Sequence, residues 1–499
     1  MRRVELWWRI PLAVLGGMVA LYIYPTENIW VLAPLVPALI LIATLGMGFW
    51  FALLTGFLAG QAFYIAHIEW LALYLGPVPL IALSTLMSVY FALGVALTSW
   101  LWRKLKPKPK SMIWFAVLAA SIWVAREWLA MSFPYGGFPW SRLGMAQAHG
   151  PWANWAYLGG ISLISFVMAL IGSLIAVAVI AGRKRGFPVK PAAITFMLLA
   201  LAPALLPLGL LNSPSGSANI AAVQGNANAG LFSNLTAGTI LQNHVDATKL
   251  VSKSELAKDL DLVVWPENAS DVDPLRSEAA RSKINAIAAE FNAPFTFGTI
   301  TVNGDDVYNS TLLWSPEGQL LDQYDKKRPV PFAEFVPDRA FWRALAPDLI
   351  DLVPRGYSFG ERDGIFKLES FDAGSLICFE IAIDSIPREL ALGGANVILS
   401  QTNNADFGYS DETYQQAAIA KLRAIETGRA VVNISTVGLS AIYLPDGKTL
   451  NELTWYQPGA MVNTVPLYSG VTPALLLDGW IDLILVALGL ASWLMVRRA

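Results

Sequence analysis

The only cysteine of this 499-residue chain, Cys378, stands in the stretch GSLICFEI, two positions before Glu380. An isolated buried cysteine is more often a small hydrophobic residue than a nucleophile. Cys378 differs because it lies in the predicted strand SLICF, close to its end, and open α/β sheets expose their ligand sites at strand ends. A nucleophilic thiolate also needs a proton acceptor and a nearby positive charge. If Cys378 is a nucleophile, other strand ends must supply these two groups.

Two other strand ends carry charged side chains. The stretch DLVVWPENAS places Glu267 just past a strand predicted at 261–265, where a proline breaks the ladder. The stretch QYDKKRPVPFAEFVP places Lys326 and Lys327 after another hydrophobic strand, ahead of a loop that contains Glu334. Such residues are commonly solvated, but PVPFAEFVP is too apolar for an exposed loop. These residues are therefore candidates for the proton acceptor and the positive charge.

Composition divides the chain into two kinds of sequence. Hydrophobic residues make up 55% of the chain and charged residues only 14%, well below the roughly 25% of an average soluble domain, so we expect membrane burial. Residues 1–211 hold four acidic and fourteen basic residues, which leaves 33 of the 37 acidic residues for the remainder. We expect a transmembrane domain of seven spans at 1–211, a polar domain at 212–472, and an eighth span with a short tail at 473–499.

Apolar runs predict eight membrane spans, because a bilayer core of about 30 Å needs roughly 20 apolar residues per helix. The runs lie near residues 10–25, 29–46, 49–66, 77–102, 112–130, 154–182, 191–211 and 475–496. Basic clusters precede the first span and follow the fourth, sixth and eighth, and the positive-inside rule puts all of them in the cytoplasm. Both termini are then cytoplasmic, and the polar domain lies on the extracytoplasmic face. A cleaved signal peptide at the first span is disfavoured because no small-residue cleavage site is evident.

The polar domain alternates short β-rich runs with helical stretches. The predicted strands are ANIAAVQGN, DLVVW, FTFGTITV, YNSTLLW, SLICF, NVILS and AVVNIS. Helices are predicted near 237–258, 276–291 and 411–429, and SPEG and PDGK are typical of hairpin turns. This order predicts a layered α/β domain with a largely buried sheet.

Three motifs in this domain, WPE, then YDKK with PFAEFVP, then CFE, resemble the Glu, Lys and Cys set of the nitrilase superfamily. The eight spans, the insertion of the domain between spans seven and eight, and the PFAEFVP segment narrow the resemblance to the apolipoprotein N-acyltransferases. These bacterial inner-membrane enzymes add the third acyl chain to lipoproteins. GFPW at 137–140 also resembles an aromatic loop of that family. The resemblance covers essentially the whole chain and implies a polytopic α-helical membrane domain with an inserted nitrilase-like αββα sandwich.

The resemblance assigns roles to the charged residues. Cys378 is the implied nucleophile, Glu267 the general base and Lys326 the electrostatic partner. Lys326 is preferred over Lys327 because it stands four residues before Val330, as the family's lysine does.

Glu334 and Glu380 match acidic residues that the family keeps near the site. Glu380 alternates with Cys378 in strand period, so both side chains are expected on one face. A carboxylate there opposes thiolate formation unless Lys326 offsets it or Glu380 is itself paired.

The activity implied by the resemblance is acyl transfer in two steps. Cys378 attacks a phospholipid ester while the backbone amide of Phe379 and the Lys326 ammonium stabilise the oxyanion, which leaves a thioester. The α-amino group of a diacylglyceryl-cysteine on an apolipoprotein then attacks the thioester, so the kinetics are ping-pong. The implied partners are a phospholipid donor, the apolipoprotein acceptor and membrane lipids, and a monomer in the bacterial plasma membrane is expected.

Loops beside the site carry the remaining candidates. NANAGLFSN, which contains Phe232, is a candidate arm above the site or, equally, an ordinary surface loop. In TNNADFG, Asn403 and Asn404 are candidates for shaping the acceptor pocket. The sequence departs from the best-known members at Asp406, where they carry an aromatic residue, and at Phe379, which replaces a frequent tyrosine. These departures bear on lipid and acceptor preference.

No metal or other cofactor is expected, because His67, His149 and His244 lie too far apart in sequence for metal-ligand spacing. The run KLKPKPK is expected at anionic headgroups rather than on nucleic acid. Two other functions stay open. One is a nitrilase-like amidase or hydrolase, for which eight spans have no evident use, and the other is a scaffold with a vestigial triad.

Overall fold

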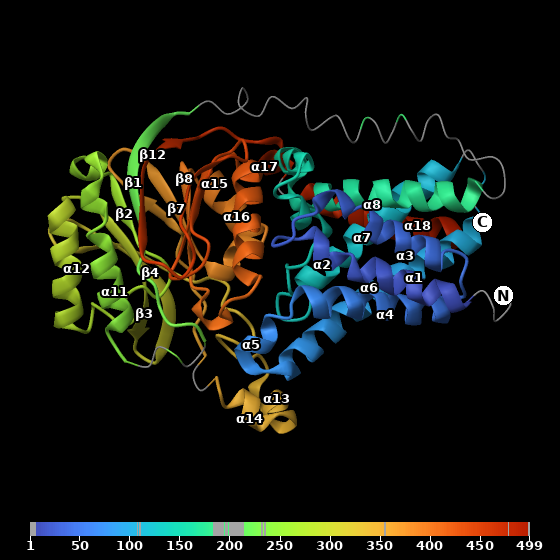
Figure 1. Ribbon diagram of the computed structural model, residues 1–499, viewed down its shortest axis with the longest axis horizontal. Coiled ribbons are helices and arrows are strands. Elements are labelled where there is room, and N and C mark those ends of the chain that lie inside the picture. Colours follow the sequence, from blue (N-terminus) through green and yellow to red (C-terminus); the bar gives the residue numbers. More distant parts are fainter. Residues whose placement is uncertain are drawn as a thin grey trace. The chain divides into compact units, whose positions relative to one another are not determined.

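The computed structural model describes residues 6–106, 108, 111–182, 194, 198, 214–230, 233, 236–353, 356–477 and 479–497 (Figure 1). Contacts divide the chain into a helical unit, Met1–Pro207 with Leu476–Ala499, and an α/β unit, Leu208–Leu475. Apart from residues 194 and 198, the span predicted at 191–211 lies outside the described residues, as does Phe232.

Four helices of the described residues are long and apolar enough to cross a membrane, judged by length and composition. They are α4 (Phe49–His67), α6 (Pro77–Leu105), α7 (Met112–Ser132) and the segment Pro151–Ile180, which contains η5 (Pro151–Trp155) and most of α8 (Ala156–Gly182). Shorter apolar helices occupy Trp7–Ile23, Trp30–Thr44 and Trp480–Ala491, at the predicted first, second and eighth spans. The apolar helical character of this region is confirmed, and the count of eight spans stays a prediction.

The unit contains further helices and short 3-10 turns. They are α1 (Leu6–Met18), α2 (Ala20–Ile23), η2 (Trp30–Leu32), α3 (Leu35–Thr44), α5 (Leu71–Leu75), η4 (Leu143–Gln147) and α18 (Trp480–Arg497), with α17 (Pro473–Leu477) at the boundary between the units.

Glycines let α4 and α6 pack closely. A Cβ on Gly56 would lie 2.9 Å from the Cβ of Val95, and one on Gly60 would lie 3.0 Å from Ser88. Small residues spaced four apart allow helix backbones to approach where lipid offers no hydrophobic drive between helices. A larger residue at Gly56 would therefore push α4 away from α6.

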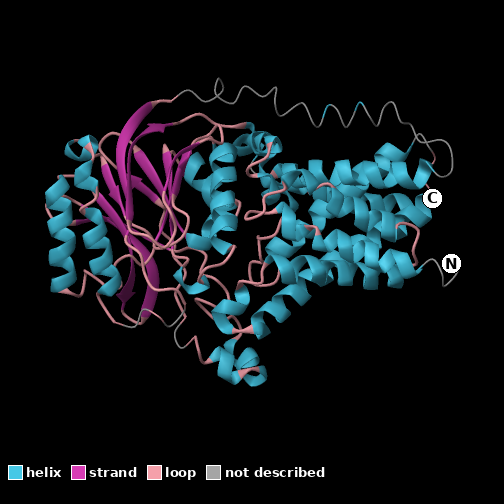
Figure 2. Ribbon diagram, viewed as in Figure 1, coloured by secondary structure: helices cyan, strands magenta, loops and turns pink. Residues whose placement is uncertain are grey.

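The α/β unit contains two six-stranded sheets (Figure 2). The first has the order β12-β1-β2-β3-β4-β5 and the second β11-β10-β9-β8-β7-β6. In the first, β1, β2 and β3 are parallel, and in the second, β7, β8 and β9 are parallel. The bounds are β1 (Gly216–Gln224), β2 (Leu262–Val264), β3 (Phe295–Asn303), β4 (Asp306–Trp314), β5 (Leu320–Asp325), β6 (Ile365–Lys367), β7 (Asp372–Ile377), β8 (Val397–Thr402), β9 (Ala430–Ser435), β10 (Ala441–Tyr443), β11 (Thr449–Glu452) and β12 (Gly459–Leu467).

Each of the seven predicted strands has a counterpart, with two corrections to local structure. The strand expected to reach Phe379 ends at Ile377, where β7 gives way to the 3-10 helix η9 (Cys378–Ala382). The helix expected at 237–258 ends at Thr248 and is followed by the 3-10 turns η7 (Val251–Lys253) and η8 (Glu255–Lys258). The turns SPEG and PDGK join β4 to β5 and β10 to β11, as predicted.

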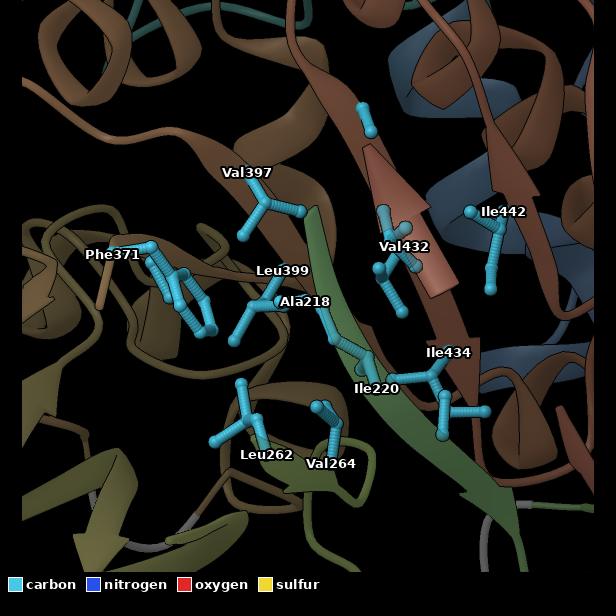
Figure 3. Close-up of a cluster of buried hydrophobic side chains, with 14 of the residues drawn as sticks. Ala218, Ile220, Leu262, Val264, Phe371, Val397, Leu399, Val432, Ile434 and Ile442 are labelled. Atoms are coloured by element: carbon cyan, nitrogen blue, oxygen red, sulfur yellow. The ribbon is translucent and has the colours of Figure 1, made fainter. Parts of the chain in front are cut away.

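The main core lies between the two sheets. Figure 3 shows the aliphatic side chains of the two inner faces: Ala218, Ile220, Leu262 and Val264 of one sheet and Val397, Leu399, Val432, Ile434 and Ile442 of the other. All of these are 0–1% exposed. Burying one such Val, Leu or Ile side chain contributes roughly 1.5–3 kcal/mol. This core holds the inner faces of the two sheets against each other.

Helices cover the outer faces of both sheets, which completes four layers (Figure 1). On the first sheet lie α11 (Thr239–Thr248) and α12 (Glu278–Phe291), which share a second buried cluster with that sheet. On the second lie α15 (Ser385–Leu392) and α16 (Glu412–Thr427). The side chain of Ser277 caps α12 by accepting from the backbone of Ala280, as its sequence position favours. The short helices α13 (Arg339–Leu345), α14 (Pro347–Ile350) and η10 (Ala405–Phe407) lie in loops.

The first and last strands of the unit are neighbours. β1 pairs with β12 in antiparallel register along its whole length, from Gly216 opposite Leu467 to Gln224 opposite Gly459. The chain therefore enters and leaves the sheet at adjacent points.

Candidate active site

Strand ends bring the three candidate catalytic residues together. Lys326 directly follows β5, Glu267 follows β2 by three residues, and Cys378 directly follows β7. β5 is related to β3 by two antiparallel steps, and β3 is parallel to β2, so β5 and β2 end at the same edge. There the Nζ of Lys326 lies 3.7 Å from Oε1 of Glu267.

Two side chains, one in β8 and one just after β9, bind the backbone beside Glu267. Nε2 of Gln401 donates to the carbonyl oxygen of Trp265 at 2.7 Å, and Oγ1 of Thr436 donates to that of Glu267 at 3.0 Å. All four residues are buried, and an unmade buried hydrogen bond would cost about 1–3 kcal/mol. These bonds tie the segment that carries Glu267 to the sheet whose strand β7 ends next to Cys378.

Glu267 is placed and tuned by its neighbours. The carboxylate is 5% exposed, and its Oε1 accepts from Nδ2 of Asn309 at 2.7 Å. Burial raises the pKa of Glu267 above its ordinary value; the charge of Lys326 lowers it, Glu334 raises it, and hydrogen bonds from Asn309 and the Cys378 thiol lower it. A carboxylate with a raised pKa that is hydrogen-bonded to the thiol is suited to accept the thiol proton.

Lys326 is an enclosed ammonium group held by two carboxylates. It is 1% exposed, and its Nζ lies 3.0 Å and 2.9 Å from the two carboxylate oxygens of Glu334. Burial lowers the pKa of Lys326, but Glu334 and Glu267 raise it more, so the net pKa lies above the ordinary value. We therefore expect Lys326 to be charged at neutral pH.

The neighbouring Lys327 has different partners. Its Nζ lies 3.8 Å from Asp363 and 3.5 Å from Glu389, and both of those carboxylates are exposed. Lys326, and not Lys327, lies against Glu267.

A tight turn in PVPFAEFVP aims Glu334 at the site. The backbone of Val330 donates to Oε2 of Glu334 at 2.6 Å, and its carbonyl accepts from the Glu334 amide at 2.8 Å. Phe332 adopts a positive φ of 64° at the turn. Asn309 also donates to Oε1 of Glu334 at 2.9 Å. Asn309 thus bridges Glu267 and Glu334.

Cys378 occupies a strained position at the turn from β7 into η9. Its φ is 55°, a left-handed conformation that costs a non-glycine residue roughly 1–3 kcal/mol. The side chain is half-buried, and Nε2 of Gln416 lies 3.6 Å from its Sγ. Burial and then the charge of Glu267 raise the pKa of Cys378 well above its ordinary value, while Lys326 lowers it. The resting group is therefore the thiol.

The expectation that Glu380 shares a strand face with Cys378 is wrong. The strand ends before Cys378, and Glu380 is fully buried within η9. Its oxygens accept from Tyr324 Oη at 3.0 Å and 2.9 Å, from the amide of Arg328 at 3.0 Å and from the amide of Ile377 at 2.9 Å. Glu380 is thus paired, and it ties the end of β7 to the segment after β5.

The loop after β8 carries three of the remaining candidates. Asn404 is 3% exposed and donates to Glu412 at 2.6 Å and to Gln416 at 2.9 Å. Oδ1 of Asn403 accepts from the amide of Ala405 at 3.1 Å, a local turn bond. Burial, and then the charge of Glu267, raises the pKa of Asp406 to about 6. Of these, Asn404 is connected to the site by hydrogen bonds, through Gln416.

Phe379 follows Cys378 directly and is half-buried. Its expected role concerns its backbone amide, and this stays a prediction. The arm that contains Phe232 lies outside the described residues.

Sequence reasoning missed Asn309 and Gln416. Asn309 lies in the run YNSTLLW, where a buried amide in an otherwise apolar strand is a detectable signal. Gln416 gives no such signal, because α16 carries polar residues at many positions. Among the described residues, no group of three or more His, Cys, Asp or Glu side chains could hold a metal ion.

Comparison with known proteins covers both units. Residues 16–174 match the apolipoprotein N-acyltransferase N-terminal domain, and residues 219–470 match the carbon-nitrogen hydrolase domain. The chain is 32% identical to the apolipoprotein N-acyltransferase of Mycolicibacterium smegmatis over 96% of this chain and 84% of that one. It is 27% identical to the protein of the same name from Vibrio vulnificus over 98% of this chain and 97% of that one.

Among solved structures, an amidase from Nesterenkonia sp. aligns with 53% of this chain and 95% of its own, at 19% identity and a TM-score of 0.40. The matches to the two domain families and to the full-length relatives agree with the motifs WPE, YDKK and CFE. This chain belongs to the apolipoprotein N-acyltransferase family.

Proposed function

We propose that the protein transfers an acyl chain from a phospholipid to the α-amino group of the diacylglyceryl-cysteine of an apolipoprotein, through a thioester on Cys378. The observation that carries this proposal is that Glu267 and Lys326, after strands of the first sheet, meet Cys378, after a strand of the second sheet, in a member of this family. The relatives' name supplies the substrate class.

The first half-reaction follows from the raised pKa values of Cys378 and Glu267. Because the thiol is protonated at rest, its proton passes to Glu267 as the sulfur attacks the ester carbonyl of the phospholipid. The Lys326 ammonium and the Phe379 amide stabilise the oxyanion. The carbon–oxygen bond then breaks, the departing lysophospholipid alkoxide takes the proton from Glu267, and the thioester remains.

The second half-reaction uses the same groups in the reverse order. The neutral α-amino group of the acceptor attacks the thioester carbonyl and gives its proton to Glu267. The carbon–sulfur bond breaks, the thiolate takes that proton back, and the new bond is an amide. Asn403 and Asn404 flank the acceptor side in this proposal. Lys326 keeps its charge throughout, because Glu334 holds it in place.

A membrane setting suits both substrates, since taking a lipid chain out of the bilayer costs about 0.8 kcal/mol per CH₂. We propose eight spans, with seven in residues 1–211 and the eighth in 473–499, and both termini in the cytoplasm. The catalytic domain at 212–472 then lies on the extracytoplasmic face of the plasma membrane, with Phe232 in an arm over the site. We propose a monomer without a cofactor.

Intact mass of the purified protein tests the proposal. After incubation with phospholipid, we expect an acyl-sized adduct on the wild type and none on Cys378→Ala. Adding a diacylglyceryl-cysteine peptide should clear the adduct and yield acylated peptide. An adduct that water clears as fast as the peptide does would favour a hydrolase. No adduct with active lipid would favour an inactive scaffold.

A further inference from the structure

A short chain of buried side chains leads from β9 to the sulfur of Cys378. Ser435 Oγ accepts from the amide of Gly438 at 2.8 Å, which leaves its own proton free to be donated. That proton points to Oδ1 of Asn404, 2.6 Å away. A side-chain amide can be placed either way round, and its partners decide which end is oxygen. Ser435 therefore fixes the oxygen end of Asn404.

The orientation of Asn404 fixes that of Gln416. With its oxygen on Ser435, Asn404 turns its NH₂ group to Glu412 Oε2 at 2.6 Å and to Gln416 Oε1 at 2.9 Å. Gln416 has then used its oxygen as an acceptor, so its NH₂ group faces Sγ of Cys378 at 3.6 Å. The opposite orientation would set two donors against each other at Asn404 and an oxygen against the sulfur.

The charges around Cys378 oppose a thiolate, so a hydrogen-bond donor at the sulfur would help to stabilise it. Three carboxylates, those of Glu267, Glu412 and Glu334, each raise the pKa of the thiol, and the ammonium of Lys326 lowers it. Lys326 is already held by Glu334 and lies beside Glu267. A neutral amide can stabilise a thiolate in this acidic setting without pairing with the carboxylates.

We propose that Gln416 is a further catalytic residue, whose side-chain NH₂ group stabilises the Cys378 sulfur when it carries negative charge. Asn404, Ser435 and Glu412 act as positioning residues that keep this donor on the sulfur. The proposal rests on the proposed role of Cys378 as the nucleophile.

The donor acts on the transition states more than on the resting states. A hydrogen bond to a charged acceptor is roughly twice as strong as one to a neutral acceptor. The sulfur is neutral in the thiol and in the thioester, and it is anionic as it attacks the ester and as it leaves the thioester. An interaction that strengthens only in the transition state raises kcat.

Alkylation of the full-length protein in detergent measures this contribution without lipid. Cys378 is the only cysteine, so every iodoacetamide adduct reports on it. Gln416→Leu removes the donor at similar volume and should slow alkylation at pH 8 by about 10- to 100-fold. It should also move the midpoint of the rate–pH profile to higher pH. Ser435→Ala frees Asn404 to turn and should give a smaller change of the same sign. Gln319→Leu, at an exposed turn, is the matched control and should match the wild type.

The outcomes separate this inference from the proposed function. Suppose that the wild type forms the acyl adduct, and that Gln416→Leu and Ser435→Ala are both alkylated at the wild-type rate with the wild-type pH midpoint. This result would overturn the role of Gln416 and leave the proposed acyltransferase function intact. A wild type that alkylates but forms no acyl adduct from phospholipid would reject the proposed function instead. If Gln416→Leu shows no thermal unfolding transition, it is not folded and Ser435→Ala becomes the test. A wild-type rate–pH profile for Ser435→Ala would then overturn the proposal.

Discussion

Two of the places where the described residues bury charge have different surroundings. In the α/β unit, Lys326 lies against Glu267 and Glu334, with Asn309 bridging the two carboxylates. In the helical unit, Arg126 and Glu127 are consecutive in α7 and only 5% and 4% exposed.

The guanidinium of Arg126 is enclosed by aromatic rings. It lies 4.3 Å from the centre of the Phe91 ring and 4.1 Å from that of Trp123, and it donates to Tyr64 Oη at 3.1 Å. Glu127 Oε1 accepts from Trp123 Nε1 at 2.9 Å. Among the described residues, Arg126 Nε and Glu127 Oε2 have no hydrogen-bond partner.

The surroundings indicate that the charges at Arg126 stabilise the fold, whereas those at Lys326 serve the proposed chemistry. Arg126 of α7 packs against Phe91 of α6 and donates to Tyr64 of α4, so this buried charge stabilises one arrangement of three helices. Lys326, Glu267 and Glu334 lie around a half-buried thiol at a strained turn. Substitutions in the two places should therefore affect different observables.

The largest expected effect is that of Lys326→Met. Losing the ammonium removes the oxyanion partner and raises the pKa of Cys378, so acyl-enzyme formation should fall by about 100- to 1,000-fold. Time-resolved intact mass measures the rate. Lys327→Met is the matched control, since Lys327 pairs with Asp363 and Glu389, and its rate should stay at the wild-type value. Equal losses in the two variants would contradict the assignment.

Arg126→Met should give the reverse pattern. It leaves Glu127 buried without its cation and removes two cation–π contacts, so the helical unit should lose about 3 kcal/mol or more. Thermal unfolding in detergent measures the loss. Arg103→Met, at an exposed site at the end of α6, should unfold like the wild type. The alkylation rate of Cys378 in the folded fraction should not change, and a large fall in that rate would show that Arg126 also affects the thiol.

Glu412→Gln should change how stability depends on pH. Burial raises the pKa of Glu412 from 4.5 to about 8, with Asn404 acting against it and Glu267 with it. The folded state then holds a proton that the unfolded state releases, so this contribution is present below about pH 4.5 and is lost as pH rises through about 8. The variant should match the wild type near pH 4.5 and melt at a higher temperature at pH 8.5. Parallel pH curves for the two proteins would rule out the raised pKa.

Tyr324→Phe should have the smallest effect. It removes the hydroxyl that donates to both oxygens of Glu380, at a cost of about 1–2 kcal/mol in stability. Chemical denaturation measures the change. Because Glu380 still accepts from the amides of Arg328 and Ile377, we expect the acylation rate of the folded variant to stay within about threefold of the wild type. A loss as large as that of Lys326→Met would place Glu380 among the reacting groups.

Sequence reasoning located candidate residues where they follow strands. Cys378 and Glu267 were recognisable as candidates because each follows an apolar run, one in each sheet. The central strands read as continuous apolar runs because both faces are buried. β12 escaped prediction because it is an edge strand whose burial is uneven and which contains Pro466.

The parts that sequence reasoning could not supply depend on backbone conformation and on distant pairing. The turn at Cys378 has a positive φ at a residue that rarely adopts one, so strand alternation wrongly extended to Glu380. Asn309 and Gln416 lie 42 and 38 positions from the residues they bond, Glu267 and Cys378. No local pattern encodes such pairs.

The pairing of β1 with β12 gives the catalytic fold the character of a cassette. Its two ends emerge from neighbouring strands, whose spacing is about 5 Å, so a host chain can accept it between two consecutive helices without stretching either. Recombination could then exchange the chemistry and the anchor independently during evolution. Replacing residues 214–470 by the corresponding segment of a relative would exchange nearly the whole catalytic fold. The two points at which the segment joins the rest of the chain would stay the same.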